Sequence, residues 1–132
     1  MKGDVMRSAT STRPWGRYTI IDHGTGYQVK RIEVLPGQRL SYQRHVHRAE
    51  HWTIVDGDGY VVLDGDRFDV RPGSRVHVER GMAHRIANPG PLPLTFIEVQ
   101  LGSYLGEDDI VRLDDDYGRR SDTPAATAGT GA

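Results

Sequence analysis

Turn-forming dipeptides interrupt this sequence so often that only short strands fit between them. Apolar and polar residues alternate in the remaining stretches, such as RYTIID (17–22) and YQVKRIEVL (27–35), as they do in half-buried strands. A helical period extends beyond a single turn only around GEDDIVRL (106–113). The sequence therefore predicts an all-β sandwich or barrel. Its turns are Pro-Gly at 36–37, 72–73 and 89–90, and Asp-Gly at 56–57, 58–59 and 64–65.

The length and charge of the chain limit its organisation and its partners. With 132 residues it is long enough for one buried core. We expect a flexible N-terminal arm over residues 1–12, a single domain over residues 13–119 and a disordered, low-complexity tail over residues 120–132. The net charge of -1 and the lack of a long apolar run predict no nucleic-acid or membrane partner and a cytoplasmic location.

The stretch YQRHVHRAEHW, residues 42–52, concentrates side chains that can bind metal. It holds three of the six histidines of the chain, a glutamine and a glutamate, whereas the absence of cysteine excludes thiolate ligands. If residues 42–47 are extended, Gln43, His45 and His47 share one face of a strand. Glycines bracket two sets of polar residues at fixed spacing: Gly37, Gln43, His45, Glu50 and Gly57, then Gly73, Glu79, Gly81, His84 and Asn88.

These two sets resemble the two sequence motifs of the cupin family. Glutamine replaces the first histidine of the first motif, and glutamate replaces the usual proline of the second. The resemblance implies a cupin double-stranded β-helix, or jelly-roll barrel, in which one metal is bound by Gln43, His45, Glu50 and His84. Two imidazoles, a carboxylate and an amide oxygen form a mixed site that suits one divalent transition metal: Zn, Mn, Co, Ni or Fe.

A different register of the same stretch offers a second ligand set. His45, His47 and His51 would also place three imidazoles near one ion, although this choice breaks the glycine spacing. His23 and His77 fit no ligand spacing, so we interpret them as structural or exposed.

A longer resemblance covers residues 13–119, nearly the whole expected domain. The phrases RPWGRY, VKRIEVLPGQRLSYQRHVHRAEHW and HRIANPGPLPLTFIEVQLGSYLGEDDIVRLDDDYGR are similar to the C-terminal isomerase region of type II mannose-6-phosphate isomerase/mannose-1-phosphate guanylyltransferases. The resemblance implies a metal-dependent isomerisation between mannose 6-phosphate and fructose 6-phosphate through an enediol. No glycine-rich nucleotide loop occurs in these 132 residues, so we expect a stand-alone isomerase-type cupin that acts on a phosphorylated sugar.

Such a reaction needs a base that carries a proton between two carbons. Glu98 is one candidate, because it alternates with apolar residues in LTFIEVQ, where burial would raise its pKa. His51 and His47 are the other candidates, since a neutral imidazole titrates near working pH.

The reaction also needs a cationic clamp for the phosphate. Arg112 is the first choice because it lies in the GEDDIVR signature. We expect Tyr104, Asp108 and Asp109 to close the mouth of the barrel or to brace Arg112. Weaker candidates for the clamp are Arg13, Lys30 and Arg85.

Two other functions fit the same residues. His45, Glu50 and His84 alone form the two-histidine, one-carboxylate set of non-haem Fe(II) oxygenases, so an oxygenase or another metal-dependent cupin enzyme of specialised metabolism is the first alternative. Gln43 as a fourth ligand would leave fewer open positions and favours the isomerase. The second alternative is a non-catalytic sugar-binding cupin. Because edge strands such as RYTIID need cover, we also expect a homodimer.

Overall fold

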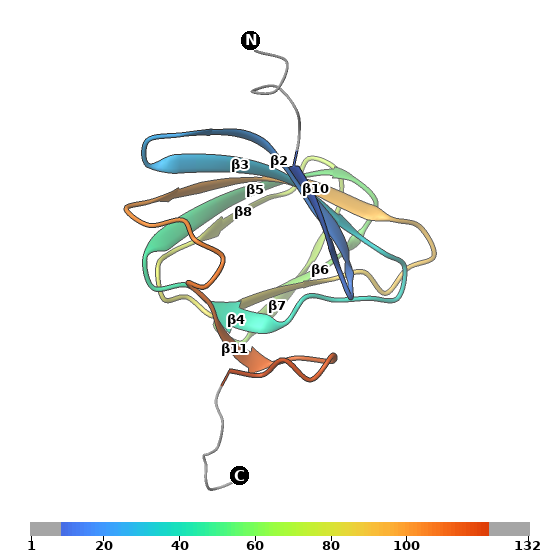
Figure 1. Cartoon of the computed structure of the whole chain (residues 1–132). Coiled ribbons are helices and arrows are strands. Elements are labelled where there is room, and N and C mark those ends of the chain that lie inside the picture. Colours follow the sequence, from blue (N-terminus) through green and yellow to red (C-terminus); the bar gives the residue numbers. More distant parts are fainter. Residues whose placement is uncertain (1–8, 122–132) are drawn as a thin grey trace, which may run out of the picture.

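The structure is a computed structural model that describes residues 9–121, and these residues form two antiparallel sheets that face each other (Figure 1). The first sheet contains six strands, in the order β1 (Ala9–Arg13), β2 (Gly16–Gly24), β3 (Tyr27–Val34), β10 (Leu94–Gly102), β5 (Arg48–Asp56) and β8 (Arg75–Val78). The second contains five, in the order β11 (Val111–Asp114), β4 (Tyr42–Arg44), β9 (His84–Ala87), β6 (Gly59–Leu63) and β7 (Asp66–Val70).

The all-β prediction is confirmed, and the turn signals lie where strands reverse. Asp64 and Gly65, with φ of 44° and 88°, form the two-residue connection between β6 and β7. The segment GEDDIVRL, the one place with a weak helical period, is a turn followed by β11. The part of the chain that the structure describes contains no helix able to span a membrane.

The N-terminal boundary differs from the prediction. Residues 9–12 of the expected flexible arm belong to β1, which pairs with β2 along its whole length. β1 therefore covers the edge of RYTIID, which removes the reason for expecting a partner subunit there; the homodimer stays a prediction without that support. Residues 1–8 of the arm and residues 122–132 of the expected tail lie outside the described residues.

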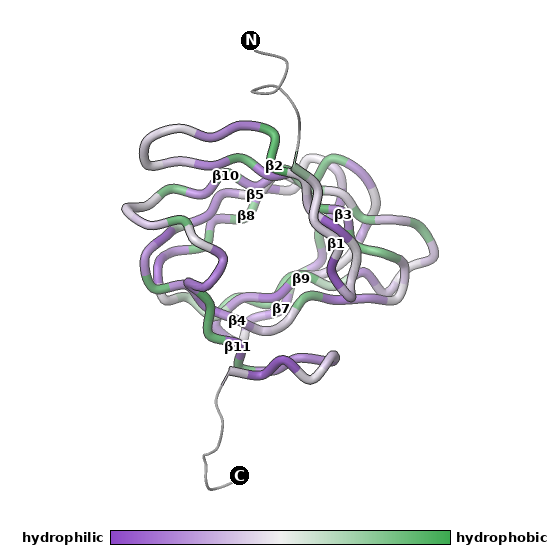
Figure 2. The backbone as a smooth tube through the Cα atoms, viewed as in Figure 1, coloured by the Kyte–Doolittle hydropathy of each residue, from purple (hydrophilic) through white to green (hydrophobic). Residues whose placement is uncertain are grey.

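The space between the sheets is apolar at one end and polar at the other. Along β10 the inward side chains change from Leu94 and Phe96 to Glu98 and Gln100, all of them buried. The register sets Phe96 beside Ile54 of β5, in a core that also contains both tryptophans. Figure 2 accordingly shows hydrophilic and hydrophobic stretches mixed along the strands of both sheets. The hydrophobic core therefore fills one end of the space between the sheets and packs against the polar interior at the other end.

Two glycines of the first motif should differ in the stability that they contribute. Gly37 and Gly57 both have positive φ, of 77° and 81°. A Cβ on Gly57 would lie 2.3 Å from the carbonyl oxygen of Pro93, whereas a Cβ on Gly37 would meet no atom within 4 Å. We expect Gly37→Ala to lower the free energy of unfolding by about 1 kcal/mol, from backbone strain alone. Gly57→Ala should lower it by about 3 kcal/mol, because overlap with backbone is added. Urea denaturation measures both, and equal losses would contradict the close approach at Gly57.

Candidate metal centre

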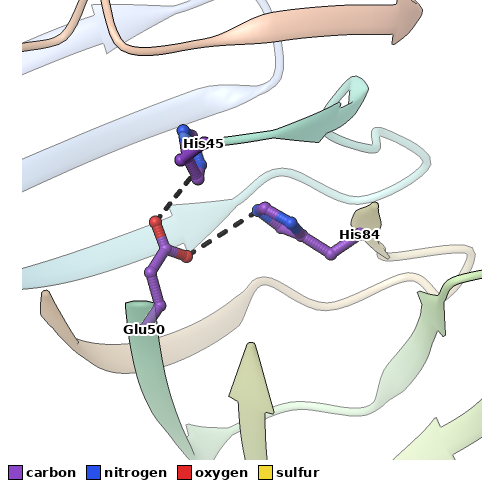
Figure 3. Close-up of side chains that lie close together, drawn as sticks. All are labelled: His45, Glu50 and His84. Carbon is purple, nitrogen blue, oxygen red and sulfur yellow. Dashed lines mark ion pairs between the residues drawn. The ribbon is translucent and has the colours of Figure 1, made fainter. Parts of the chain in front are cut away.

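Three buried side chains from both sheets meet at the polar end of the barrel. His45 follows β4, Glu50 lies on β5 and His84 begins β9 (Figure 3). The Nε2 atom of His45 lies 3.2 Å from one carboxylate oxygen of Glu50, and the Nε2 atom of His84 lies 3.8 Å from the other. All three potential ligand atoms lie within 4.8 Å of one another. The spacing of the two motifs thus corresponds to a real cluster.

The hydrogen bonds of the two histidines decide which nitrogen carries the proton. Nδ1 of His45 donates to the carbonyl oxygen of Asp109 at 2.6 Å, and Nδ1 of His84 donates to that of Met82 at 2.9 Å. Since a carbonyl oxygen only accepts, both Nε2 atoms present lone pairs to the cluster. Nε2 of His84 is buried and has no hydrogen-bond partner in residues 9–121. A buried nitrogen without a partner is costly, and a metal ion would supply one.

The charges of the cluster also fit a metal. Burial lowers the pKa of His45 to about 4, and burial likewise lowers the pKa of His84. Burial alone would raise the pKa of Glu50, but His84, Arg48 and His45 outweigh it and lower that pKa. At neutral pH the site therefore contains two neutral imidazoles and one carboxylate, the protonation state that metal binding requires.

Arg48 and Trp52 hold the carboxylate of Glu50 in place. Nε of Arg48 donates to one oxygen at 2.8 Å, and the indole N–H of Trp52 donates to the other at 3.0 Å. The sequence reasoning missed Arg48. Its signal was available in the alternation of β5, because a residue two positions before the inward Glu50 also points inward.

Gln43, the fourth expected ligand, lies beside His45 but is turned away from metal binding. Its side-chain oxygen accepts a hydrogen bond from Ser41 Oγ at 2.5 Å, and its amide nitrogen lies 3.3 Å from Nε2 of His45. A rotation of the amide would exchange the two atoms and direct the oxygen to the cluster. Its role as a ligand stays a prediction.

His51, a candidate base, lies on the outer face of the first sheet. It is exposed and stacks on His77 of β8, with ring centroids 4.3 Å apart. Neighbouring residues of a strand point to opposite faces, so an inward Glu50 forces His51 outward. The alternative set of three histidines is therefore not brought together, and His77 is exposed as expected. His23 is also exposed.

His47 leaves the cluster because β4 is shorter than expected. The strand ends at Arg44, and the carboxylate of Asp109 accepts the backbone N–H groups of Val46 and His47, both at 2.9 Å. These bonds turn the chain, so His47 is exposed and packs against Tyr104 instead. Asp109 thus braces the segment that carries His45. The sequence had suggested instead that it braces Arg112.

Glu98 lies in the same cavity as the cluster, as expected for a strand that lines the barrel. Gln100 Nε2 donates to its carboxylate at 2.6 Å, and Gln28 in turn donates to Gln100 at 3.0 Å. Burial, reinforced by Glu50, raises the pKa of Glu98 to about 8. Of the three candidates for the base, this is the one that the structure brings to the cavity.

Arg112 and Arg13 line the cavity, joined by Arg119, which the sequence reasoning missed. Burial lowers the pKa of Arg112. The positive charges of Arg119 and Arg13 lower that pKa further, whereas the carboxylates of Asp115 and Glu107 act in the opposite direction. Nε of Arg112 is buried without a hydrogen-bond partner in the described part of the chain. Crowded positive charge with an unused donor would be relieved by an anion.

Lys30 and Arg85 also line the cavity, but each has an anionic partner. Lys30 forms an ion pair with Glu107 and lies over the ring of Tyr18 at 4.0 Å. Arg85 binds the carboxylate of Asp114 at 3.1 Å. They are accordingly less suited than Arg112 to take up a phosphate.

The family of the chain follows from comparison with known sequences. The family described as mannose-6-phosphate isomerase C-terminal matches residues 2–115. The chain belongs to this family. This match confirms the resemblance to the isomerase region that was seen in the sequence.

The chain is similar to one part of much longer proteins. The chain is 53% identical over 107 residues to xanthan biosynthesis protein XanB of Xanthomonas campestris pv. campestris, and the match covers 81% of the chain and 23% of XanB. It is 50% identical over 107 residues to mannose-1-phosphate guanylyltransferase ManC of Salmonella typhimurium, covering 81% of the chain and 22% of ManC. The chain thus spans less than a quarter of these relatives.

Solved structures confirm the cupin double-stranded β-helix. The capsular polysaccharide assembling protein CapF of Staphylococcus aureus superposes with a TM-score of 0.70 at 19% identity, over 82% of this chain and 34% of CapF. A Klebsiella pneumoniae protein with a double-stranded β-helix domain gives 0.64 at 19% identity, over 83% of this chain and 90% of that one. At such identities the similarity shows the fold alone.

The ligand set makes a direct prediction for metal affinity. We expect Glu50→Gln to weaken Zn²⁺ binding at least about a hundredfold, because even the loss of an outer partner of a ligand costs roughly 10–100-fold. Gln43→Ala should weaken it about tenfold if the amide oxygen is a ligand. Competition with a chromophoric chelator measures both affinities, and His51→Ala serves as the control on the outer face. Unchanged affinity in Glu50→Gln would rule out the cluster, whereas unchanged affinity in Gln43→Ala would remove only Gln43.

Proposed function

We propose that this chain is a metal-dependent sugar-phosphate isomerase that interconverts mannose 6-phosphate and fructose 6-phosphate. One observation carries the proposal: a single cavity is lined by a histidine–glutamate cluster fit for a metal, by a carboxyl of raised pKa and by an arginine, Arg112, with an unused donor. The family and the name of ManC support a mannose phosphate as the sugar. A cytoplasmic location is part of the same proposal.

His45, Glu50 and His84 would hold the ion, with Gln43 as the fourth ligand. A bound Zn, Mn, Co, Ni or Fe ion would polarise the sugar oxygens on C1 and C2. Arg48 and Trp52 fix the direction of the carboxylate, and the carbonyl oxygens of Asp109 and Met82 fix the two imidazole rings.

Glu98 is proposed to move the proton between carbons. Its ionised carboxylate removes the proton from C2 of the aldose, which gives an enediolate, and delivers it to C1 of that enediolate, while the hydroxyl proton passes from O2 to O1 and the ketose forms. Glu98 is buried, so the proton that it holds would be returned to the sugar more often than it is lost to water. A pKa of about 8 leaves a base that is strong enough for this task and still partly ionised near neutral pH.

Arg112 and Arg13 are proposed to bind the phosphate at the cavity, with Arg119 beside them. Neither Arg112 nor Arg13 forms an ion pair with a carboxylate in residues 9–121, whereas Arg119 already binds Asp115 at 3.0 Å. Guanidinium groups without such partners are suited to bidentate binding of phosphate oxygens.

Arg112→Ala tests the substrate together with the clamp. We expect the wild-type chain, loaded with Zn²⁺, Co²⁺ or Mn²⁺, to form fructose 6-phosphate from mannose 6-phosphate in a coupled assay. The variant should show a KM about ten- to a hundredfold higher with a smaller change in kcat, because a charge-assisted bond to phosphate is lost. Arg67→Ala is the control, since Arg67 packs on Tyr60 and does not line the cavity. Metal-loaded wild type without activity would refute the substrate; an unchanged KM would remove Arg112 from the clamp.

Glu98→Gln tests the base through the pH dependence of the rate. A base acts when it is ionised, so the wild-type rate should rise with pH as Glu98 loses its proton near pH 8. The amide of the variant could not take up a proton, and kcat should fall about 10²–10⁴-fold with this rise abolished. Glu79→Gln, at an exposed carboxylate that does not line the cavity, is the control. A variant that keeps the pH-dependent rise would exclude Glu98 as the base.

A non-haem Fe(II) oxygenase is the second candidate function. It is favoured by the three residues that meet directly, two histidines and one carboxylate, and by the orientation of Gln43, whose oxygen is bound to Ser41. Anaerobic loading with Fe(II) followed by measurement of oxygen consumption separates the two functions. Consumption of oxygen coupled to oxidation of a sugar substrate would favour the oxygenase over the isomerase.

A further inference from the structure

Arg48 contacts two ligand atoms of the candidate metal centre at once. The side chain is buried, and its Nε donates to a carboxylate oxygen of Glu50 at 2.8 Å. Its Nη2 lies 3.2 Å from Nε2 of His45. Since a guanidinium has no acceptor, this second contact is also a donation, into the lone pair of the imidazole.

The two ligand atoms differ in how many partners they can take. Nε2 of His45 has one lone pair, because Nδ1 carries the proton that Asp109 accepts. A carboxylate has about four acceptor positions, so Glu50 can keep Arg48 and still bind an ion. Gln43 also approaches Nε2 of His45, at 3.3 Å, but an amide can turn its oxygen inward. A cation at His45 therefore excludes one specific contact, that of Arg48 Nη2.

We propose that Arg48 is a positioning residue that changes partner when the centre takes up a divalent cation. It releases His45, keeps Glu50, and presents the freed Nη2 donor to the cavity. The inference rests on the metal site of the proposed function. It adds that the guanidinium of Arg48 competes with the metal ion for Nε2 of His45, and that its Nη2 donor moves when the ion binds.

The surroundings of Arg48 favour this exchange. Burial alone would lower the pKa of Arg48, but Glu50, Glu98 and Glu107 outweigh it and raise that pKa, so the side chain stays charged. All four residues line the same cavity. A freed Nη2 group thus remains charged and faces the cavity, and the contact to Glu50 serves as the pivot.

Zn²⁺ affinity distinguishes competition from simple support of the ligands. If Arg48 only oriented Glu50, Arg48→Met would weaken Zn²⁺ binding, as the loss of an outer partner normally does. If Arg48 competes for His45, Arg48→Met should strengthen binding by about tenfold or more, since a charge-assisted contact no longer has to be broken. Trp52→Phe removes the other donor to Glu50 without touching His45 and should weaken binding. Arg44→Met, an exposed arginine of the same segment, should leave it unchanged.

A second measurement uses the folded wild-type chain. In NMR spectra of ¹⁵N-labelled protein, Zn²⁺ should shift Nε2 of His45 and release the Nη protons of Arg48 to rapid exchange, while its Nε–H stays protected. Arg48→Met that binds Zn²⁺ equally or more weakly, or Nη protons that stay restrained with Zn²⁺ bound, would overturn the exchange and leave the isomerase proposal intact. Lack of Zn²⁺ binding in both wild type and Arg48→Met would overturn both.

Discussion

The antiparallel pairing of β5 with β10 is the constraint on which the core and the candidate centre both depend. Its register sets Phe96 beside Ile54 in the apolar layer, and then Gln100 beside Glu50 in the polar layer, with Glu98 between them. A slip of β10 by one residue would turn Phe96, Glu98 and Gln100 outward. The same ladder therefore fixes the hydrophobic support and the distance between the carboxylate of the centre and the carboxyl of raised pKa.

A polar interior of this kind is stable only if its charges compensate one another. Glu50 has Arg48, and Lys30 has Glu107, so these charges are paired within the cavity. Glu98 accepts a hydrogen bond from the neutral amide of Gln100, and burial, reinforced by Glu50, raises its pKa, so that it retains its proton to higher pH. The difference between the two buried carboxylates follows from their partners, and it separates a group that binds cations from one that exchanges a proton.

The sequence predicted the fold and the central cluster because both are encoded in local spacing. Turn dipeptides and alternation identify strands, and the motif glycines set the register that brings His45, Glu50 and His84 together. Spacing could not show that β4 ends at Arg44, because the bonds that turn the chain there come from Asp109, more than sixty residues away. Arg119 gave no signal either, since it lies beyond the last strand, where no alternation constrains its direction.

The segment between β10 and β11 links the two halves of the site. Its backbone orients His45 through Asp109, its Glu107 neutralises the buried Lys30, and it leads directly into Arg112. An anion bound by Arg112 would therefore act on the same stretch of chain that holds an imidazole of the centre. The GEDDIVR signature combines these three roles within seven residues, which explains why a segment without regular structure over most of its length carries so much of the chemistry.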